Sequence, residues 1–72
     1  MSMEEQRKRI GKRIAQLRKE SGLTQQDLAD KTGLLRNHIS RIEQGKYSVG
    51  FDTLTKIGQA MDKEIDYVEP TR

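Results

Sequence analysis

Apolar residues recur at a spacing of three or four positions in four segments of the chain, which is the period of an amphipathic helix. The residues expected to face inward are Ile10, Ile14, Leu17, Leu28, Ala29, Leu35, Ile39, Ile42, Phe51, Leu54, Ile57 and Met61. The clearest stripe is that of the third segment, where Leu35, Ile39 and Ile42 lie within about 60° of each other on a helical wheel. The pattern predicts an all-α protein with four helices.

Residues that start and stop helices bound these segments. Ser2 and Thr24 each have an acid three positions later, which is the arrangement of a capping box or a shorter version of it. Gly22, Gly33 and Gly45 stand where a glycine commonly ends a helix. We therefore expect one domain, residues 1–72, with helices over 2–21, 24–32, 35–44 and 51–61.

The C-terminal segment has a different pattern. Ile65 and Tyr67 alternate with acids, and Pro70 follows, which predicts a strand over 64–69. A lone strand is not stable in water, and the chain offers no second one. We expect it to pair with its copy in a homodimer, with Ile65, Tyr67 and Val68 in the interface. The alternative is a short fifth helix packed on the fourth.

The composition narrows the function classes. Without Cys, no disulfide or thiolate metal site can support the fold. The single His and the scattered carboxylates form no ligand cluster and no nucleophile–base pair, so we expect no metal, no cofactor and no enzyme activity. No apolar run approaches the roughly 18 residues of a membrane span, and residues 1–13 do not resemble a signal peptide. We expect a cytoplasmic, nucleoid-associated protein that binds no membrane and no small-molecule ligand.

The charge is distributed unevenly along the chain. Residues 1–46 contain eleven Lys and Arg against six Asp and Glu, a balance of +5, whereas residues 47–72 have a balance of −2. A basic front and an acidic back suit a protein that presents one side to a polyanion. A solvated helical surface whose charges happen to segregate is the alternative explanation.

The polar side of the third predicted helix has an unusual set of groups. It combines two cations, two amides and a hydroxyl, without a carboxylate, from Arg36, Asn37, Ser40, Arg41 and Gln44. Such side chains, on a helix held clear of the core by a partner helix, suit the base edges of the DNA major groove.

Over residues 10–61 the chain resembles the Cro and phage-repressor type of helix-turn-helix, the XRE family. The matching residues are Thr24, Gln25, Leu28, Ala29, Gly33, Ile39, Ser40, Arg41, Ile42, Glu43, Gln44, Gly45, Thr53, Leu54, Ile57 and Ala60. The resemblance implies that the second helix crosses the DNA backbone, that the third enters the major groove, and that the protein binds as a two-fold dimer.

The resemblance also implies roles for single residues. Arg36, Asn37, Ser40 and Arg41 match positions that face the bases, although one or more of them could touch only phosphate or solvent. Phosphate contacts are implied for three further residues, Gln25, Lys46 and Tyr47. For Gln25 the alternative is a plain helix-start residue, and for Tyr47 it is packing.

Three more residues complete the expected set. Arg18 and Glu43 match a pair that forms a structural salt bridge between the third and first helices in some relatives. His38 lies at the edge of the polar face beside Arg41, where we expect a phosphate contact or simple exposure.

The chain departs from the family pattern at both ends of the third helix. Leu35 stands where the family often has a Ser or Thr cap, and an absent cap typically costs about 1 kcal/mol. We expect Leu35 to recover this by packing in the inward stripe. Val49 stands where a proline is common.

Together these observations predict a transcriptional regulator, a repressor, that binds double-stranded DNA as a homodimer on a palindromic operator. One alternative is an antitoxin that binds its own operator and a toxin protein. Another is a protein-interaction adaptor without DNA binding, which the polar third helix disfavours because an adaptor surface needs apolar anchors.

Overall fold

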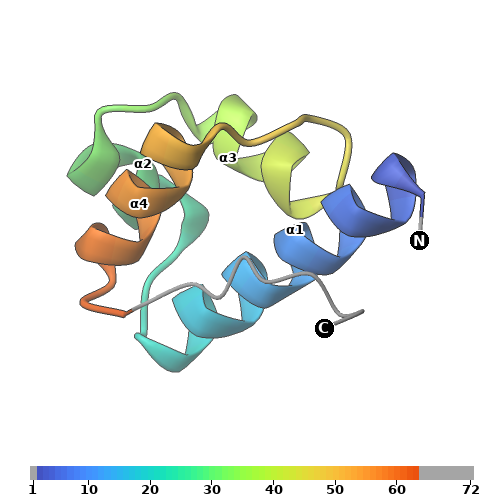
Figure 1. Cartoon of the computed structure of the whole chain (residues 1–72). Helices are drawn as coiled ribbons and strands as arrows, with labels where there is room; N and C mark the ends of the chain where they lie inside the picture. Colours follow the sequence, from blue (N-terminus) through green and yellow to red (C-terminus); the bar gives the residue numbers. More distant parts are fainter. Residues whose placement is uncertain (1, 64–72) are drawn as a thin grey trace.

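Four helices make up residues 2–63, the part of the chain that the computed structural model describes (Figure 1). They are α1 (Met3–Glu20), α2 (Gln25–Thr32), α3 (Arg36–Glu43) and α4 (Phe51–Ala60). Helix α3 packs against both α1 and α2, and α4 packs against α2. The all-α fold is confirmed. The strand expected over 64–69, the alternative fifth helix, and the interface residues Ile65, Tyr67 and Val68 lie outside the described residues.

Capping boxes start the first two helices. The Ser2 hydroxyl accepts from the Glu5 amide at 3.1 Å, and the Glu5 carboxylate accepts from the Ser2 amide at 2.9 Å. Thr24 and Asp27 make the same reciprocal pair before α2, at 3.0 and 2.9 Å. The pKa of the Asp27 carboxyl is lowered, mainly by the hydrogen bond from the Thr24 backbone amide and secondly by a hydrogen bond with the Thr24 side chain. At the other end of α2, Gly33 adopts φ 78°, a left-handed conformation that ends the helix at little steric cost.

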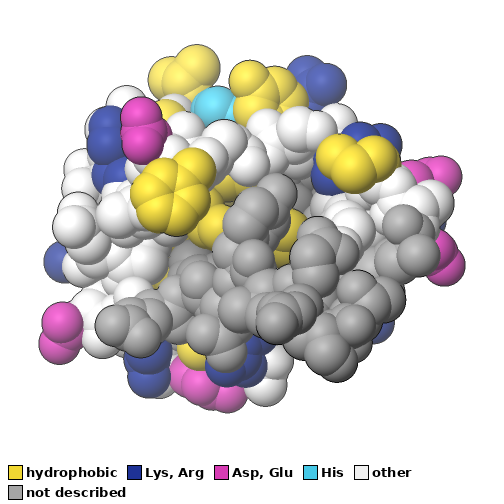
Figure 2. All heavy atoms as spheres, viewed as in Figure 1, with side chains coloured by type: hydrophobic (Ala, Val, Ile, Leu, Met, Phe, Trp, Pro, Cys, Tyr) yellow, Lys and Arg dark blue, Asp and Glu magenta, His cyan; other side chains and the backbone are white. Residues whose placement is uncertain are grey.

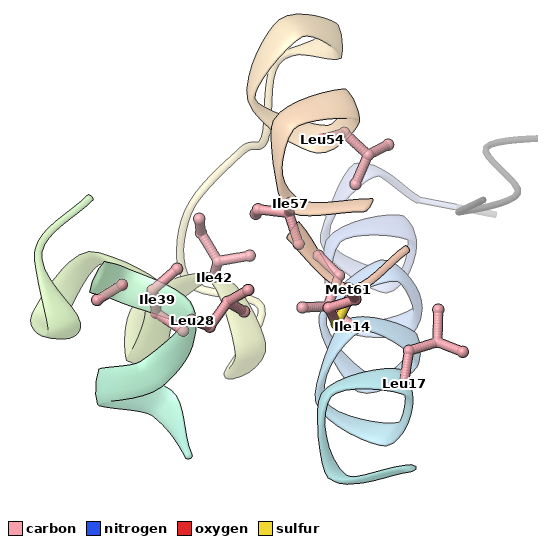
Figure 3. Close-up of a cluster of buried hydrophobic side chains, with 9 residues drawn as sticks. Ile14, Leu17, Leu28, Ile39, Ile42, Leu54, Ile57 and Met61 are labelled. Carbon is pink, nitrogen blue, oxygen red and sulfur yellow. The ribbon is translucent and has the colours of Figure 1, made fainter. Parts of the chain in front are cut away.

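The core is aliphatic and draws on all four helices (Figure 3). Its buried members are Ile14, Leu17, Leu28, Ala29, Ile39, Ile42, Leu54, Ile57 and Met61. Each was expected to face inward from the helical spacing. Helix α3 contributes only Ile39 and Ile42, which leaves the rest of its circumference to polar residues.

Two residues that were expected to face inward are exposed instead. Leu35 is 76% exposed and Phe51 is 74% exposed. Leu35 is the N-cap of α3 and has extended dihedral angles (φ −79°, ψ 146°), so the helical wheel does not describe where its side chain goes. Phe51 begins α4 and lies about 70° from the centre of the arc formed by the buried Leu54, Ile57 and Gly58. The prediction was wrong at both positions because a helix-terminal residue leaves the inward stripe easily.

Glycines allow α1 and the end of α3 to approach closely. A Cβ added at Gly11 would overlap the carbonyl oxygen of Ile42 and lie 2.7 Å from that of Glu43. A Cβ at Gly45 would lie 2.7 Å from Cγ of Lys8. The absence of these two side chains lets the backbones meet, and so sets how α3 sits on α1. Within residues 2–63 no helix has the length and apolar character that a membrane crossing requires.

Candidate nucleic-acid interface

The outward side of α3 forms one polar surface. Arg36, Asn37 and Arg41 are exposed, and Ser40 is half-buried, so the structure brings together the four residues assigned to base contacts. All lie away from the buried Ile39 and Ile42. The first turn of α3 contains no acidic residue, so no carboxylate there would repel an approaching anion.

One of these groups is engaged within the helix. The side-chain amide of Gln44 donates to the Ser40 hydroxyl at 2.9 Å. A hydroxyl can still donate its own proton while it accepts one, so Ser40 keeps a donor for a base or phosphate. Gln44, which is exposed, orients that donor.

A buried ion pair ties the end of α3 to α1. Arg18 Nε lies 2.7 Å from Glu43 Oε2, and Arg18 Nη2 donates to Glu43 Oε1 at 3.1 Å. The two side chains are only 10% and 6% exposed. The remaining guanidinium nitrogen, Nη1, donates to the Leu23 carbonyl at 2.8 Å. This bidentate geometry, together with the bond to Leu23, gives the buried charges several hydrogen-bond partners. Arg18 and Glu43 are the pair that the family resemblance implies.

Gln25 connects this ion pair to the polar surface of α3. Its amide nitrogen donates to Glu43 Oε1 at 3.0 Å, and its oxygen accepts from Arg36 Nη1 at 3.5 Å. The side chain is therefore held from both ends by protein groups. The nitrogen has a second proton free for a phosphate oxygen, so the expected contact and the observed bonds are compatible.

His38 and Tyr47 contact each other across the start of the loop that follows α3. Their ring centroids are 4.5 Å apart, and the rings are nearly perpendicular at 85°. Nε2 of His38 is buried without a hydrogen-bond partner among residues 2–63, whereas Tyr47 remains 45% exposed. Packing is the alternative role expected for Tyr47, and the structure shows such a contact. Simple exposure does not describe His38.

The loop over residues 46–50 carries the other expected phosphate contact. Lys46 is exposed, and its amide donates to the Arg41 carbonyl at 2.9 Å, so the residue follows α3 directly. Val49 packs against the core and anchors the far end of the loop.

Charge of both signs occurs on the face of the molecule that Figure 2 shows. On the face shown in Figure 2, Lys and Arg side chains are scattered around the edge and alternate with Asp and Glu. That face therefore presents no single basic patch among the described side chains. No three His, Asp or Glu side chains within residues 2–63 are placed to share a metal ion.

Leu35 is exposed beside this surface, although the helical wheel places it inward. The signal was present in the sequence, since the residue occupies the cap position at which wheel geometry no longer applies. Gly11 carried no comparable signal, because its close contact is with a helix about thirty residues away in the chain.

The chain matches a protein-family model and proteins of several organisms. The model described as helix-turn-helix matches residues 14–68. The HTH-type transcriptional regulator y4dJ of Sinorhizobium fredii is 33% identical over 66 residues, which cover 90% of this chain and 86% of the relative. The immunity repressor protein of Bacillus phage phi105 is 34% identical over 59 residues, which cover 82% of this chain and 41% of that protein.

A solved structure has the same arrangement of helices. It is the restriction-modification controller protein C.AhdI of Aeromonas hydrophila, with a TM-score of 0.84 and 30% sequence identity. The similarity covers 89% of this chain and 93% of C.AhdI.

Proposed function

The chain belongs to the helix-turn-helix family of transcriptional regulators, and from this we propose that it binds double-stranded DNA as a homodimer and represses transcription from a palindromic operator. The observation that carries the proposal is the outward side of α3, which presents Arg36, Asn37 and Arg41 without an intervening carboxylate. Carboxylates at these positions would repel phosphates, whereas Arg and Asn pair with guanine and adenine edges in the major groove.

The supporting contacts fit the same mode of binding. The hydrogen bond from Arg36 to Gln25 joins the start of α3 to the start of α2, where both can meet one DNA backbone. Lys46 lies at the opposite end of α3, beyond Gly45. Phosphate contacts from both ends would fix the register, and the side chains between them would read the sequence.

Selection of bound duplexes from a random DNA pool tests the proposal. We expect enrichment of an inverted repeat whose half-sites are centred about one DNA turn, near 34 Å, apart, because a two-fold dimer presents two copies of α3. A single unrepeated site would contradict the dimer, and a pool without enrichment at any salt concentration would contradict sequence-specific binding.

Substitutions separate base contacts from phosphate contacts. We expect Arg36→Ala or Asn37→Ala to weaken binding to the selected site by roughly 1–3 kcal/mol and to relax the preference at one position per half-site. Lys46→Ala should weaken binding to all sequences equally, and should reduce the slope of log affinity against log salt by about 0.9 per lost phosphate contact. Titrations of the selected and a scrambled duplex measure both effects. An equal loss on the two duplexes for Arg36→Ala would make that residue a phosphate contact.

The match to C.AhdI favours a second, narrower candidate within the same class. The fold of that controller protein is matched over 93% of its length, with 30% sequence identity. We therefore propose control of restriction-modification genes as the second candidate. The antitoxin alternative has no comparable observation in its favour. The genes adjoining the coding sequence discriminate the two, because a methyltransferase and endonuclease pair supports the controller and a toxin gene supports the antitoxin.

A further inference from the structure

Leu35 is placed where neither its size nor its chemistry serves the fold. It is 76% exposed, and although it is the N-cap of α3 its side chain makes no capping hydrogen bond. Ser, Thr, Asn or Asp at this position would satisfy one of the free amides and would expose no isobutyl group. Leucine is therefore disfavoured here both as an N-cap and as an exposed side chain. Such departures from local preference are expected where a residue serves binding.

Its position in the proposed complex gives this exposed group a partner. Leu35 directly precedes Arg36 and Asn37, at the N-terminal end of the helix, which is the end that meets base edges in this mode of binding. The major groove displays one apolar group, the C5-methyl of thymine, and apolar side chains recognise it by contact. The polar ends of its neighbours Arg36 and Asn37 suit hydrogen bonds to guanine and adenine edges instead.

We propose that Leu35 is a specificity-determining residue that contacts the C5-methyl of a thymine beside the bases read by Arg36 and Asn37. This rests on the proposed function. On binding, the exposed isobutyl group and the methyl leave water together, so the contact stabilises the complex while the free protein gains nothing from it. The missing cap is then explained by a side chain selected for the complex rather than for the isolated helix.

The experiment removes the methyl from the DNA and the isobutyl group from the protein. Each thymine of the selected site is replaced in turn by uracil, which lacks only the C5-methyl, and affinity is measured for the wild type and for Leu35→Ala. For the wild type we expect one thymine per half-site at which uracil lowers affinity by about fourfold, the equivalent of one buried methyl group. Leu35→Ala should bind the thymine site more weakly and should be indifferent to uracil at that position.

Two further variants act as controls. Leu35→Ser supplies a cap, so we expect its thermal unfolding midpoint to rise while its affinity for the thymine site falls. A merely structural leucine would not produce these opposite changes. Phe51→Ala removes a side chain of similar exposure, 74%, from the start of α4, and should keep the wild-type response to uracil.

Each remaining outcome decides the matter. The role of Leu35 would be overturned, with DNA binding intact, if uracil left the wild-type affinity unchanged at every position. The same conclusion would follow if uracil lowered the affinity of Leu35→Ala as much as that of the wild type. A wild-type protein that selects no duplex would overturn the proposed function, and this role with it.

Discussion

Replacing Arg18 by alanine is expected to reduce the free energy of unfolding by about 3–5 kcal/mol. The substitution leaves the Glu43 carboxylate, whose side chain is 6% exposed, without its counterion, and removes the donor to the Leu23 carbonyl. A chain of this length has a total stability of about 4–11 kcal/mol, so the variant should be marginal at room temperature. Urea unfolding followed by far-ultraviolet circular dichroism measures the change.

A double substitution separates the cost of an unpaired charge from the worth of the pair. Arg18→Met with Glu43→Leu removes both charges and keeps side chains of related volume. We expect the free energy of unfolding of this double variant to lie within about 1 kcal/mol of the wild-type value, because replacing a buried ion pair by hydrophobic residues often leaves stability unchanged. If Arg18→Ala alone also changed the free energy of unfolding by only about 1 kcal/mol, the ion pair would be accessible to water in solution, contrary to the structure.

Gly11→Ala is the second substitution with a large expected effect, about 3 kcal/mol of destabilisation. Alanine is favoured over glycine in a helix by about 1 kcal/mol, so propensity alone predicts the opposite sign. The added methyl, however, would overlap the carbonyl oxygen of Ile42 and crowd that of Glu43, and backbone atoms cannot rotate away as a flexible side chain can. Helix α1 must then move off α3, which loosens the packing around Ile14. Overpacking of this kind costs typically 1–3 kcal/mol and occasionally more.

Gly50→Ala provides the matched control, because the same methyl there meets nothing within 4 Å. It should cost at most about 1 kcal/mol, since alanine is a poorer N-cap than glycine. The two variants can be compared by the same urea titration. A Gly11→Ala protein more stable than the wild type would show that α1 and α3 are farther apart than described.

Under the proposed function, the Arg18–Glu43 ion pair serves DNA binding as well as stability. Glu43 accepts a hydrogen bond from the Gln25 amide nitrogen and so orients this side chain. The Gln25 oxygen in turn accepts a hydrogen bond from Arg36. In the proposed complex these contacts hold a base-reading side chain before DNA arrives, which reduces the conformational entropy lost on binding. Of the polar surface of α3, Arg36 is thus connected through Gln25 to the buried ion pair.

Much of the fold follows from local features of the sequence. Helix bounds differ from the expected ones by at most one residue, because the capping boxes at Ser2 and Thr24 and the glycine stop at Gly33 act through neighbours a few positions away. The buried residues inside each helix follow from a period of 3.6 residues. The polar side of α3 could be identified for the same reason.

The exposure of Leu35 and Phe51 was missed although its causes are local, since one is the N-cap of α3 and the other lies at the edge of the inward arc of α4. What only the tertiary structure decided concerns contacts between distant segments. No local pattern shows that Gly11 must lack a side chain, since the obstructing carbonyls belong to α3. Likewise, the edge-on contact of His38 with Tyr47 depends on the course of a loop without regular structure. Periodicity and capping act over one or two turns, whereas these features depend on where one helix meets another.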